Sequence, residues 1–247
     1  MGVASSRLSS SQASHDQDKK LMKPSSKLAV LDRIYALYDQ FAASLNLACK
    51  KYCSYCCTTS VTLTTIEGYK IIRALQSSAK AEWGEKIRQA TAQTYFKPKI
   101  TTNQLANLCA DGIEPPEEES SEWKSCPFLT ENQCPIYAVR PFGCRCLVSR
   151  HDCGKEGYAD MDDFVLSVNT IFLQAIEHMD AKGCSGNLLH MLGVLAVEEN
   201  RQAYEDNRLK CTTAGLIANH PLKVLMIPPE HRTKMESILN SLREIHV

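Results

Sequence analysis

The stretch CKKYCSYCC, from Cys49 to Cys57, carries four cysteines within nine residues. Thiols at this density can be disulfide partners, redox groups, metal ligands or the CxxxCxxC loop of a radical enzyme. A second cysteine-rich stretch begins about seventy residues later and carries Cys126, Cys134, Cys144, Cys146 and Cys153. Its prolines and its turn-like TENQ predict a loop that can fold ligands back onto the first stretch. The two stretches together therefore predict a metal site that joins distant parts of the chain.

An amphipathic helix is expected to lead into the first stretch, because apolar residues recur at gaps of three and four: Leu31, Ile34, Tyr38, Phe41, Leu45 and Ala48. If this helix continues through the motif, Cys49, Cys53 and Cys56 fall within an arc of about 60°. Their Cβ atoms would then lie about 5–6 Å apart, which suits one metal or a small iron–sulfur cluster. Cys57 would point away and serve another ligand position, a second metal or the core.

Both stretches resemble the YkgJ-type cysteine-cluster family, whose zinc- or iron-chelating CxxCxxCC domain has a cysteine run followed by CPFL, a short spacer, C-x-IY, RP and CR. CKKYCSYCC and CPFLTENQCPIYAVRPFGCR carry this pattern from about Cys49 to Cys146. The resemblance implies metal chelation by the matching residues Cys49, Cys53, Cys56, Cys57, Cys126, Cys134 and Cys144. A flagellin lysine methylase has a similar cysteine set and is associated with an iron–sulfur cluster. The family has no single established reaction.

The number of matching cysteines bears on the choice of metal. Seven thiols exceed the four that one closed site needs, so two metals, one cluster with extra thiols, or some structural cysteines are possible arrangements. An excess of convergent thiols favours an iron–sulfur cluster, such as [4Fe–4S], over zinc, and thiol redox chemistry without metal is the third alternative. Either metal centre carries a net charge of about −2 with four thiolates. Arg140, within the RP motif, is expected to compensate that charge or to support the ligands, while Lys50, Lys51 and Arg145 are further cationic neighbours.

Composition limits the class of partner and the compartment. The 28 basic and 28 acidic residues cancel, so no nucleic-acid partner is expected. No secretory signal and no apolar run of roughly 18 residues is visible, which predicts a cytoplasmic protein without a membrane span. In that compartment the twelve cysteines are interpreted as ligands or redox groups more than as disulfides. Three of them are interpreted as small core residues: Cys109, Cys184 and Cys211.

The fold is predicted to be mainly α, a helical domain with an irregular cysteine-rich metal-binding loop region. Residues 1–26 are predicted to form a disordered tail, 27–155 the chelating region, and 156–247 a helical region packed on it in the same domain. Thr64 and Glu67 form a possible capping box before a helix, and VTLTT is the one fair strand candidate. Further helices are expected at about 81–95, 103–109, 161–182, 187–207 and after Pro228–Pro229. The acidic segment 114–123 is expected to be a solvated connector.

The first stretch also satisfies the signature of radical S-adenosylmethionine enzymes, because Tyr55 precedes Cys56 in a CxxxCx-aromatic-C pattern. In those enzymes the motif follows the first strand of a βα barrel, whereas here it follows a helical pattern. The sequence therefore predicts a metal-binding protein with an iron–sulfur cluster for electron transfer, sensing or a linked enzymatic step. The alternative is a zinc-stabilised interaction module without catalysis, and the radical enzyme ranks third. No catalytic residue is assigned, since Glu67 and Asp152 have no visible spatial partner.

Overall fold

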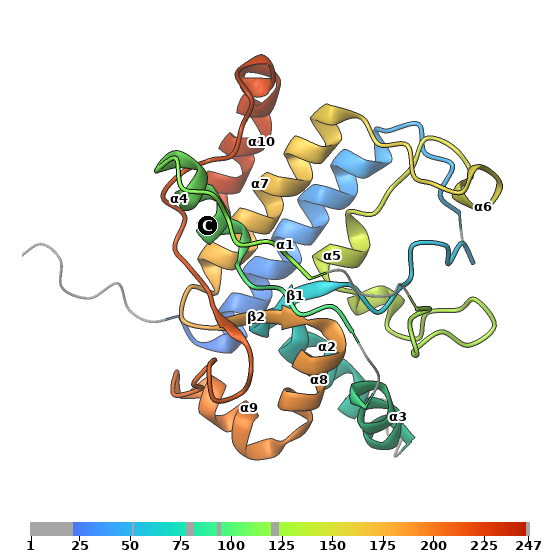
Figure 1. The fold of residues 1–247 in the computed structure, drawn as a ribbon, viewed down its shortest axis with the longest axis vertical. Coiled ribbons are helices and arrows are strands. Elements are labelled where there is room, and N and C mark those ends of the chain that lie inside the picture. The colour runs from blue at the N-terminus through green and yellow to red at the C-terminus, as the bar shows by residue number, and fades with distance from the viewer. Residues whose placement is uncertain (1–21, 51, 78–81, 93–94, 120–123, 246–247) are drawn as a thin grey trace, which may run out of the picture.

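The computed structural model describes residues 22–50, 52–77, 82–92, 95–119 and 124–245. About 53% of the described residues are helical, and the described strands form one small sheet, which confirms the mainly α prediction. Figure 1 shows the helices arranged around this sheet, with irregular loops gathered near α5 and α6. Within the described ranges, no helix is long and apolar enough to cross a membrane.

The first helix, α1, spans Pro24–Ala43. It begins at a proline in the first turn, a position where the missing N–H is not needed. Helix α1 therefore begins before the predicted end of the tail at residue 26, while residues 1–21 lie outside the described part. The predicted continuation of the helix through Ala48 into the cysteines is wrong. Ser44 ends the helix, since its hydroxyl donates back to the Phe41 carbonyl at 2.7 Å.

Strand β1 (Thr62–Thr64) leads directly into α2 (Thr65–Ser77), as VTLTT and the capping box predict. The Thr64 N–H donates to Glu67 Oε2 at 2.8 Å, which is the reciprocal half of a capping box. Strand β1 pairs antiparallel with β2 (Cys184–Asn187), and β2 pairs antiparallel with β3 (Ile217–Ala218). Strands β2 and β3 were not predicted because four and two residues are too short to show alternation.

The remaining helices are α3 (Glu82–Thr91), α4 (Thr102–Ala110), η1 (Tyr137–Val139), α5 (Phe142–Arg145), α6 (Cys153–Glu156), α7 (Asp163–Met179), α8 (Leu188–Ala196), α9 (Glu198–Glu205), η2 (Pro229–His231) and α10 (Arg232–Glu244). The longer helices follow the predicted order, whereas the short helices η1, α5, α6 and η2 were not predicted. The helix predicted at 187–207 is divided in two, because Val197 has an extended backbone between α8 and α9. The described part of the acidic connector, 114–119, has no helix or strand, and residues 120–123 lie outside the described ranges.

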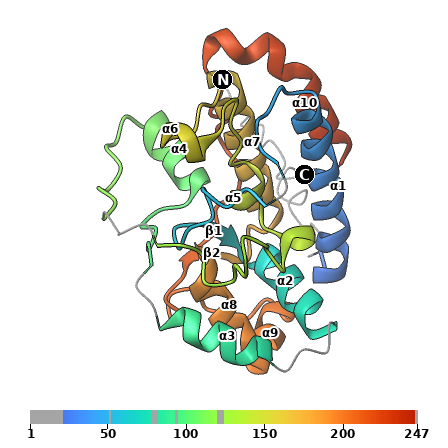
Figure 2. The ribbon, with the colours of Figure 1, turned by 90° about the vertical axis from the view of Figure 1, so that its right-hand side faces the viewer.

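An aromatic core joins α1, α5 and α7. Helices α1 and α7 run side by side in both views (Figures 1 and 2). Between them, the Tyr38 ring meets Phe142 edge-on at 4.7 Å and Phe172 edge-on at 5.2 Å between centroids. Phe142 and Phe172 stack at 5.6 Å, and neither ring is exposed. Helix α5 has only four residues, so this buried phenylalanine is its anchor to the long helices.

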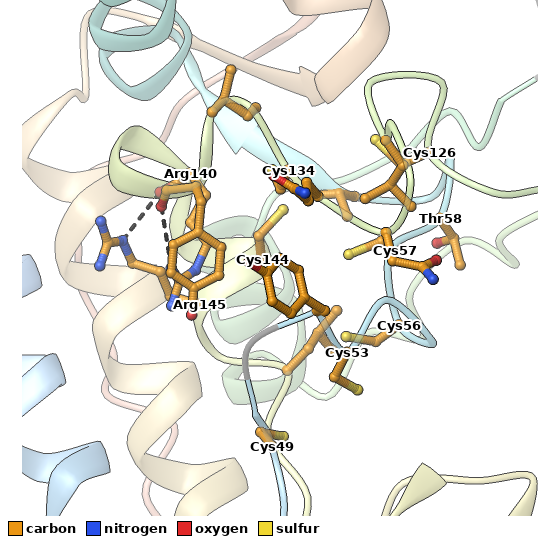
Figure 3. A pocket seen from close by; sticks show the side chains of 18 of the residues that line it. Cys49, Cys53, Cys56, Cys57, Thr58, Cys126, Cys134, Arg140, Cys144 and Arg145 are labelled. Atoms are coloured by element: carbon orange, nitrogen blue, oxygen red, sulfur yellow. Dashed lines mark hydrogen bonds between the residues drawn. The ribbon is translucent and has the colours of Figure 1, made fainter. Parts of the chain in front are cut away.

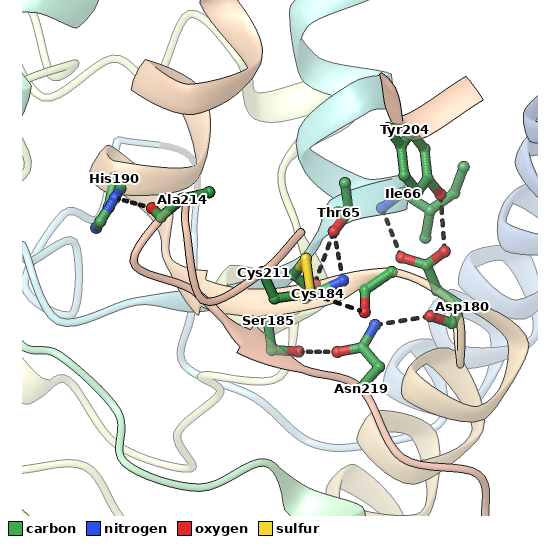
Figure 4. Close-up of a disulfide and its surroundings, with 11 residues drawn as sticks. Thr65, Ile66, Asp180, Cys184, Ser185, His190, Tyr204, Cys211, Ala214 and Asn219 are labelled. Atoms are coloured by element: carbon green, nitrogen blue, oxygen red, sulfur yellow. Dashed lines mark hydrogen bonds between the residues drawn. A yellow bond between two sulfur atoms is a disulfide. The ribbon is translucent and has the colours of Figure 1, made fainter. Parts of the chain in front are cut away.

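A second buried region surrounds the fully buried Asp180 at the end of α7 (Figure 4). Asp180 Oδ1 accepts from Lys27 Nζ at 2.8 Å and from the Tyr204 hydroxyl at 2.7 Å. Its other carboxylate oxygen accepts the Ile66 N–H at 3.0 Å, and its carbonyl accepts the Asn219 amide at 2.8 Å. This Asp180 network joins α1, α2, α7 and α9, and each charged oxygen in it has a donor.

The Asp180 network lies beside a disulfide between Cys184 and Cys211, across 27 residues. The prediction that these two cysteines are unpaired core residues is therefore wrong, although Cys184 is fully buried. Cys109 is also not a core residue, because it is exposed on α4. The disulfide could not be predicted from spacing alone: β2 and the segment before β3 are brought together only by the sheet.

Candidate metal centre

Seven cysteines line one cavity of about 500 Å³ (Figure 3). They are the seven that match the family pattern: Cys49, Cys53, Cys56, Cys57, Cys126, Cys134 and Cys144. Three separate pieces of chain supply them, namely the loop between α1 and β1, the loop after residue 124, and α5. We call this space the thiol cavity.

The first loop places its cysteines through consecutive turns and not through a helix. The Cys53 N–H donates to the Lys50 carbonyl at 3.1 Å, and the Cys57 N–H donates to the Ser54 carbonyl at 3.0 Å. Within the first of these turns Tyr52 has a φ of 70°, a left-handed conformation that is uncommon for a residue other than glycine. The predicted helical phase of Cys49, Cys53 and Cys56 is therefore wrong, but the turns bring the same thiols to the same cavity.

Backbone hydrogen bonds join the two cysteine-rich stretches. The Cys126 N–H donates to the Cys57 carbonyl at 2.9 Å, and the Thr59 N–H donates to the Lys124 carbonyl at 2.9 Å. A side-chain bond adds to these, since the Ser54 hydroxyl donates to Asn132 Oδ1 at 2.9 Å. Cys57 and Cys126 are thus fixed next to each other, although 69 positions separate them in the sequence.

The turn TENQ is a tight hairpin that holds Cys126 and Cys134 on either side of it. Thr130 and Gln133 exchange both backbone hydrogen bonds, at 2.8 and 3.1 Å. The two central residues have φ values of 50° for Glu131 and 61° for Asn132, as a type I′ turn requires. Asparagine tolerates this conformation better than most residues, which explains why the chain turns here.

Helix α5 positions Cys144 through a bond that the sequence did not reveal. The Phe142 N–H, at the start of α5, donates to Glu67 Oε1 at 2.7 Å. The same oxygen accepts from the Tyr35 hydroxyl at 2.7 Å. Gly143 allows α5 to approach β1, because a Cβ at this position would lie 2.6 Å from the Thr62 carbonyl oxygen. The capping box predicts only the Thr64 contact of Glu67, and nothing local indicates the contact with α5.

Burial raises the pKa of most cavity thiols. The pKa of Cys144 lies well above its usual value, and burial also raises those of Cys126 and Cys134. A hydrogen bond between the side chains of Cys56 and Cys57 raises the pKa of the first and lowers that of the second. Several thiolates so close together repel each other, so a bound cation is what would stabilise them in the charged form.

Two arginines stand beside the thiol cavity with different contacts. The Arg140 guanidinium stacks on the Tyr137 ring at 3.8 Å, and its charge favours the thiolate forms of Cys56 and Cys134. Arg145 Nη1 donates to both carboxylate oxygens of Asp39 at 3.1 Å, and Arg145 Nε donates to the Arg140 carbonyl at 3.1 Å. The charge of Arg140 therefore acts on the thiols, whereas the hydrogen bonds of Arg145 hold the loop before α5 against α1.

The two predicted lysine neighbours contribute less. Lys50 lines the cavity, but its side chain is 76% exposed and lies 4.0 Å from Asp152. Lys51 lies outside the described residues. Among the described cations, charge compensation at the cavity therefore falls mainly on Arg140.

Two further cysteines lie behind the cavity wall. Cys146 is buried in the core cluster, and its thiol donates to the Gly143 carbonyl at 3.7 Å. Cys153 is buried at the start of α6. Neither lines the thiol cavity, which agrees with their place outside the firm part of the sequence pattern.

The donor set suits a thiophilic metal, since the described residues that line the cavity include seven thiols and no carboxylate. The thiols surround a space and do not converge on one point: among the described residues, no three cysteine, histidine or acidic side chains stand in a ready ligand geometry for a single ion. A group that fills the space, or a closing of the side chains around an ion, would satisfy them.

Comparison with protein families gives the class of the domain. The model of the CxxCxxCC family, described as "Putative zinc- or iron-chelating domain", matches residues 48–163. The matched segment includes all seven cavity cysteines, and it confirms the family resemblance that the two stretches carry. This segment is thus similar to the cysteine-cluster domains of that family, whose description names zinc or iron as the metal. Searches of the curated proteins and of the solved structures gave no match.

Proposed function

We propose that the thiol cavity binds an iron–sulfur cluster held jointly by the Cys49–Cys57 and Cys126–Cys144 segments. The observation that carries this proposal is the arrangement of seven thiols around a space of about 500 Å³. A structural zinc ion draws four ligands to about 2.3 Å and leaves no such space. A cluster spreads its cysteine ligands over several irons, so it suits thiols that surround a space.

Arg140 is the residue that we assign to charge compensation at this centre. A cluster with four thiolates is anionic, and its burial requires a nearby cation. The Arg140 guanidinium lies on the cavity wall and is held in place by Tyr137, whose carbonyl accepts an Arg140 Nη1–H at 3.1 Å. An arginine in this position would change the reduction potential of the cluster and would not be one of its ligands.

The position of the cavity suits electron exchange or sensing. Two aromatic side chains at its rim are more than half exposed, Tyr52 at 54% and Tyr137 at 60%. A cluster behind this rim would lie close enough to the surface for a redox partner or an oxidant to reach it. A linked enzymatic step is the third role that we include for the cluster.

The fold supports this proposal over the radical-enzyme alternative. In the described residues the strands form one three-stranded antiparallel sheet, and the cysteine loop follows α1 and not a barrel strand. The zinc-stabilised module is the second candidate, because the family description names zinc beside iron. Chelation would then loosen the cysteine loops without any redox signal.

A reductive titration of the anaerobically purified protein distinguishes the two. We expect a visible absorbance that dithionite bleaches, together with lower metal content in both Cys53→Ser and Cys134→Ser. Cys109→Ser is the matched control, because Cys109 is free, exposed and outside the cavity. A colourless, redox-silent zinc protein would contradict the cluster, and full metal content in both cysteine variants would contradict the shared site.

A further inference from the structure

We propose that Arg145 is a positioning residue of the thiol cavity, which holds Arg140 and Cys144 in place and thereby sets the reduction potential of the bound cluster. This inference rests on the proposed function, because it assumes that a cluster fills the cavity. Arg145 follows Cys144 as the last residue of α5, and its side chain is only 8% exposed. Figure 3 shows Arg145 and Arg140 together on one side of the cavity, next to Cys144.

Two residues of α1 hold the Arg145 guanidinium. It lies over the ring of Tyr35, 4.2 Å from the ring centroid, and its Nη1 donates to both carboxylate oxygens of Asp39 at 3.1 Å. Tyr35 and Asp39 are four positions apart in α1, so they lie on the same face of the helix. The buried Tyr35 donates its hydroxyl to Glu67, the residue that also accepts the Phe142 N–H at the start of α5. Arg145 is therefore bound to the packed part of the fold.

The other donors of Arg145 hold the loop that carries Arg140. Arg145 Nε donates to the Arg140 carbonyl and Nη2 donates to the Ala138 carbonyl, both at 3.1 Å. The Arg140 guanidinium is in turn stacked on the Tyr137 ring at the cavity wall. Because Arg145 holds the backbone of Arg140 and Tyr137 holds its side chain, the position of the Arg140 charge depends on Arg145.

The shape of the Arg145 side chain is expected to matter more than its charge. Asp39 offsets the charge, whereas the simultaneous bonds to Asp39, Ala138 and Arg140 use the planar fork of a guanidinium. Lysine keeps the positive charge but has a single side-chain nitrogen, so it does not reproduce this fork. Arg145→Lys therefore changes the position of the loop without changing the total charge at the cavity.

A displaced Arg140 is expected to lower the reduction potential. One-electron reduction by dithionite adds a negative charge to the cluster, so a nearby cation stabilises the reduced form more than the oxidised form. We expect Arg145→Lys to lower the potential, and Arg140→Gln to lower it further. If Arg145 acts through Arg140, adding Arg145→Lys to Arg140→Gln produces no further fall, since the two changes then remove the same interaction.

Hydrogen exchange of the metal-free full chain tests the positioning without the cluster. The Phe142 N–H bonds to Glu67 and the Cys144 N–H bonds to the Pro141 carbonyl, so exchange of these two amides reports the opening of α5. Loss of hydrogen bonds from a charged group should speed this exchange about tenfold or more in Arg145→Lys.

Two further variants complete the exchange experiment. Asp39→Asn, at an exposed position of α1, weakens only the ion pair and should give a smaller increase than Arg145→Lys. Arg88→Lys is the matched control, because Arg88 makes a similar fork with Glu85 on the exposed surface of α3. Its exchange in α5 and its reduction potential should equal those of the wild type.

The outcomes separate this inference from the proposed function. Wild-type exchange in Arg145→Lys, or a further fall in potential when Arg145→Lys is added to Arg140→Gln, overturns the inference and leaves the cluster standing. If Arg145→Lys does not fold, Asp39→Asn decides, and wild-type exchange and potential in that variant overturn the inference. A wild-type chain without a cluster contradicts the proposed function, whereas exchange in the metal-free variants still decides whether Arg145 positions α5.

Discussion

Cysteines serve two regions of this chain in opposite ways. At the sheet, Cys184 and Cys211 are joined in a disulfide beside the Asp180 network, where each buried charge has a partner. In the thiol cavity, seven free cysteines on two loops and on α5 surround a space of about 500 Å³. The first region is complete as it stands. The second has ligand groups whose charged forms are disfavoured until a cation joins them.

The two regions are therefore expected to have different roles, a structural role for the Asp180 network and a binding role for the thiol cavity. The Asp180 network holds α1, α2, α7 and α9, so damage to it is expected to reduce the stability of the whole fold. The thiol cavity is held by a few backbone bonds and by α5, so damage to it is expected to reduce metal content first. A variant in one region should therefore leave the property that depends on the other region unchanged, except where a contact joins the two.

The largest loss of stability is expected for Asp180→Ala. This change leaves the buried Lys27 ammonium without its carboxylate and removes the acceptor of Tyr204 and the Ile66 N–H. Breaking a buried pair in this way costs about 3–5 kcal/mol in the free energy of unfolding. Chemical denaturation of the metal-free proteins measures the difference. Asp206→Ala, at an exposed ion pair with Arg208, is the control, and equal stability of the two variants would contradict the role of the network.

Removal of the disulfide is expected to have the next largest effect. The bond closes a segment of 27 residues, and a cross-link of that length contributes about 2–4 kcal/mol. The double variant Cys184→Ala, Cys211→Ala should lose this stability and keep its metal content. If metal is lost together with the disulfide in a protein that remains folded, the two regions are not independent.

Glu67→Gln is expected to reduce both the stability of the fold and the affinity for metal. Glu67 Oε1 accepts from Tyr35 and the Phe142 N–H, and Oε2 accepts from Thr64, so an amide nitrogen must face at least one donor. We expect a loss of about 1–3 kcal/mol in unfolding free energy. Because Phe142 begins the helix that carries Cys144, metal affinity should also fall. Glu85→Gln, on the surface of α3, should change neither property, and unchanged metal affinity in Glu67→Gln would refute its part in positioning Cys144.

The smallest effect on stability is expected for Cys126→Ser in the metal-free protein. A serine keeps the size of the side chain and the backbone pairing with Cys57, so the unfolding free energy should change by less than about 1 kcal/mol. Its metal content should nevertheless fall well below that of Cys109→Ser. A large loss of stability without metal would mean that Cys126 is mainly a packing residue.

The class of fold and the residues that line the cavity could be predicted from the sequence. The end of α1 and the contacts between distant segments could not. Periodicity found most helices, and the capping box placed the start of α2. The end of α1 was missed because apolar residues beyond Ala43 continue the helical spacing, while Ser44 ends the helix through a local hydrogen bond. Glu67 at α5 and the pairing of Cys184 with Cys211 depend on contacts between distant segments, which no local pattern encodes.

Metal and sulfide analysis of the anaerobically purified full chain, together with its visible spectrum, tests the central claim most directly. A cluster in the thiol cavity predicts iron and acid-labile sulfide in similar amounts, with a broad visible absorbance that disappears when the cavity cysteines are replaced. A colourless protein that contains zinc, no iron and no sulfide would contradict it.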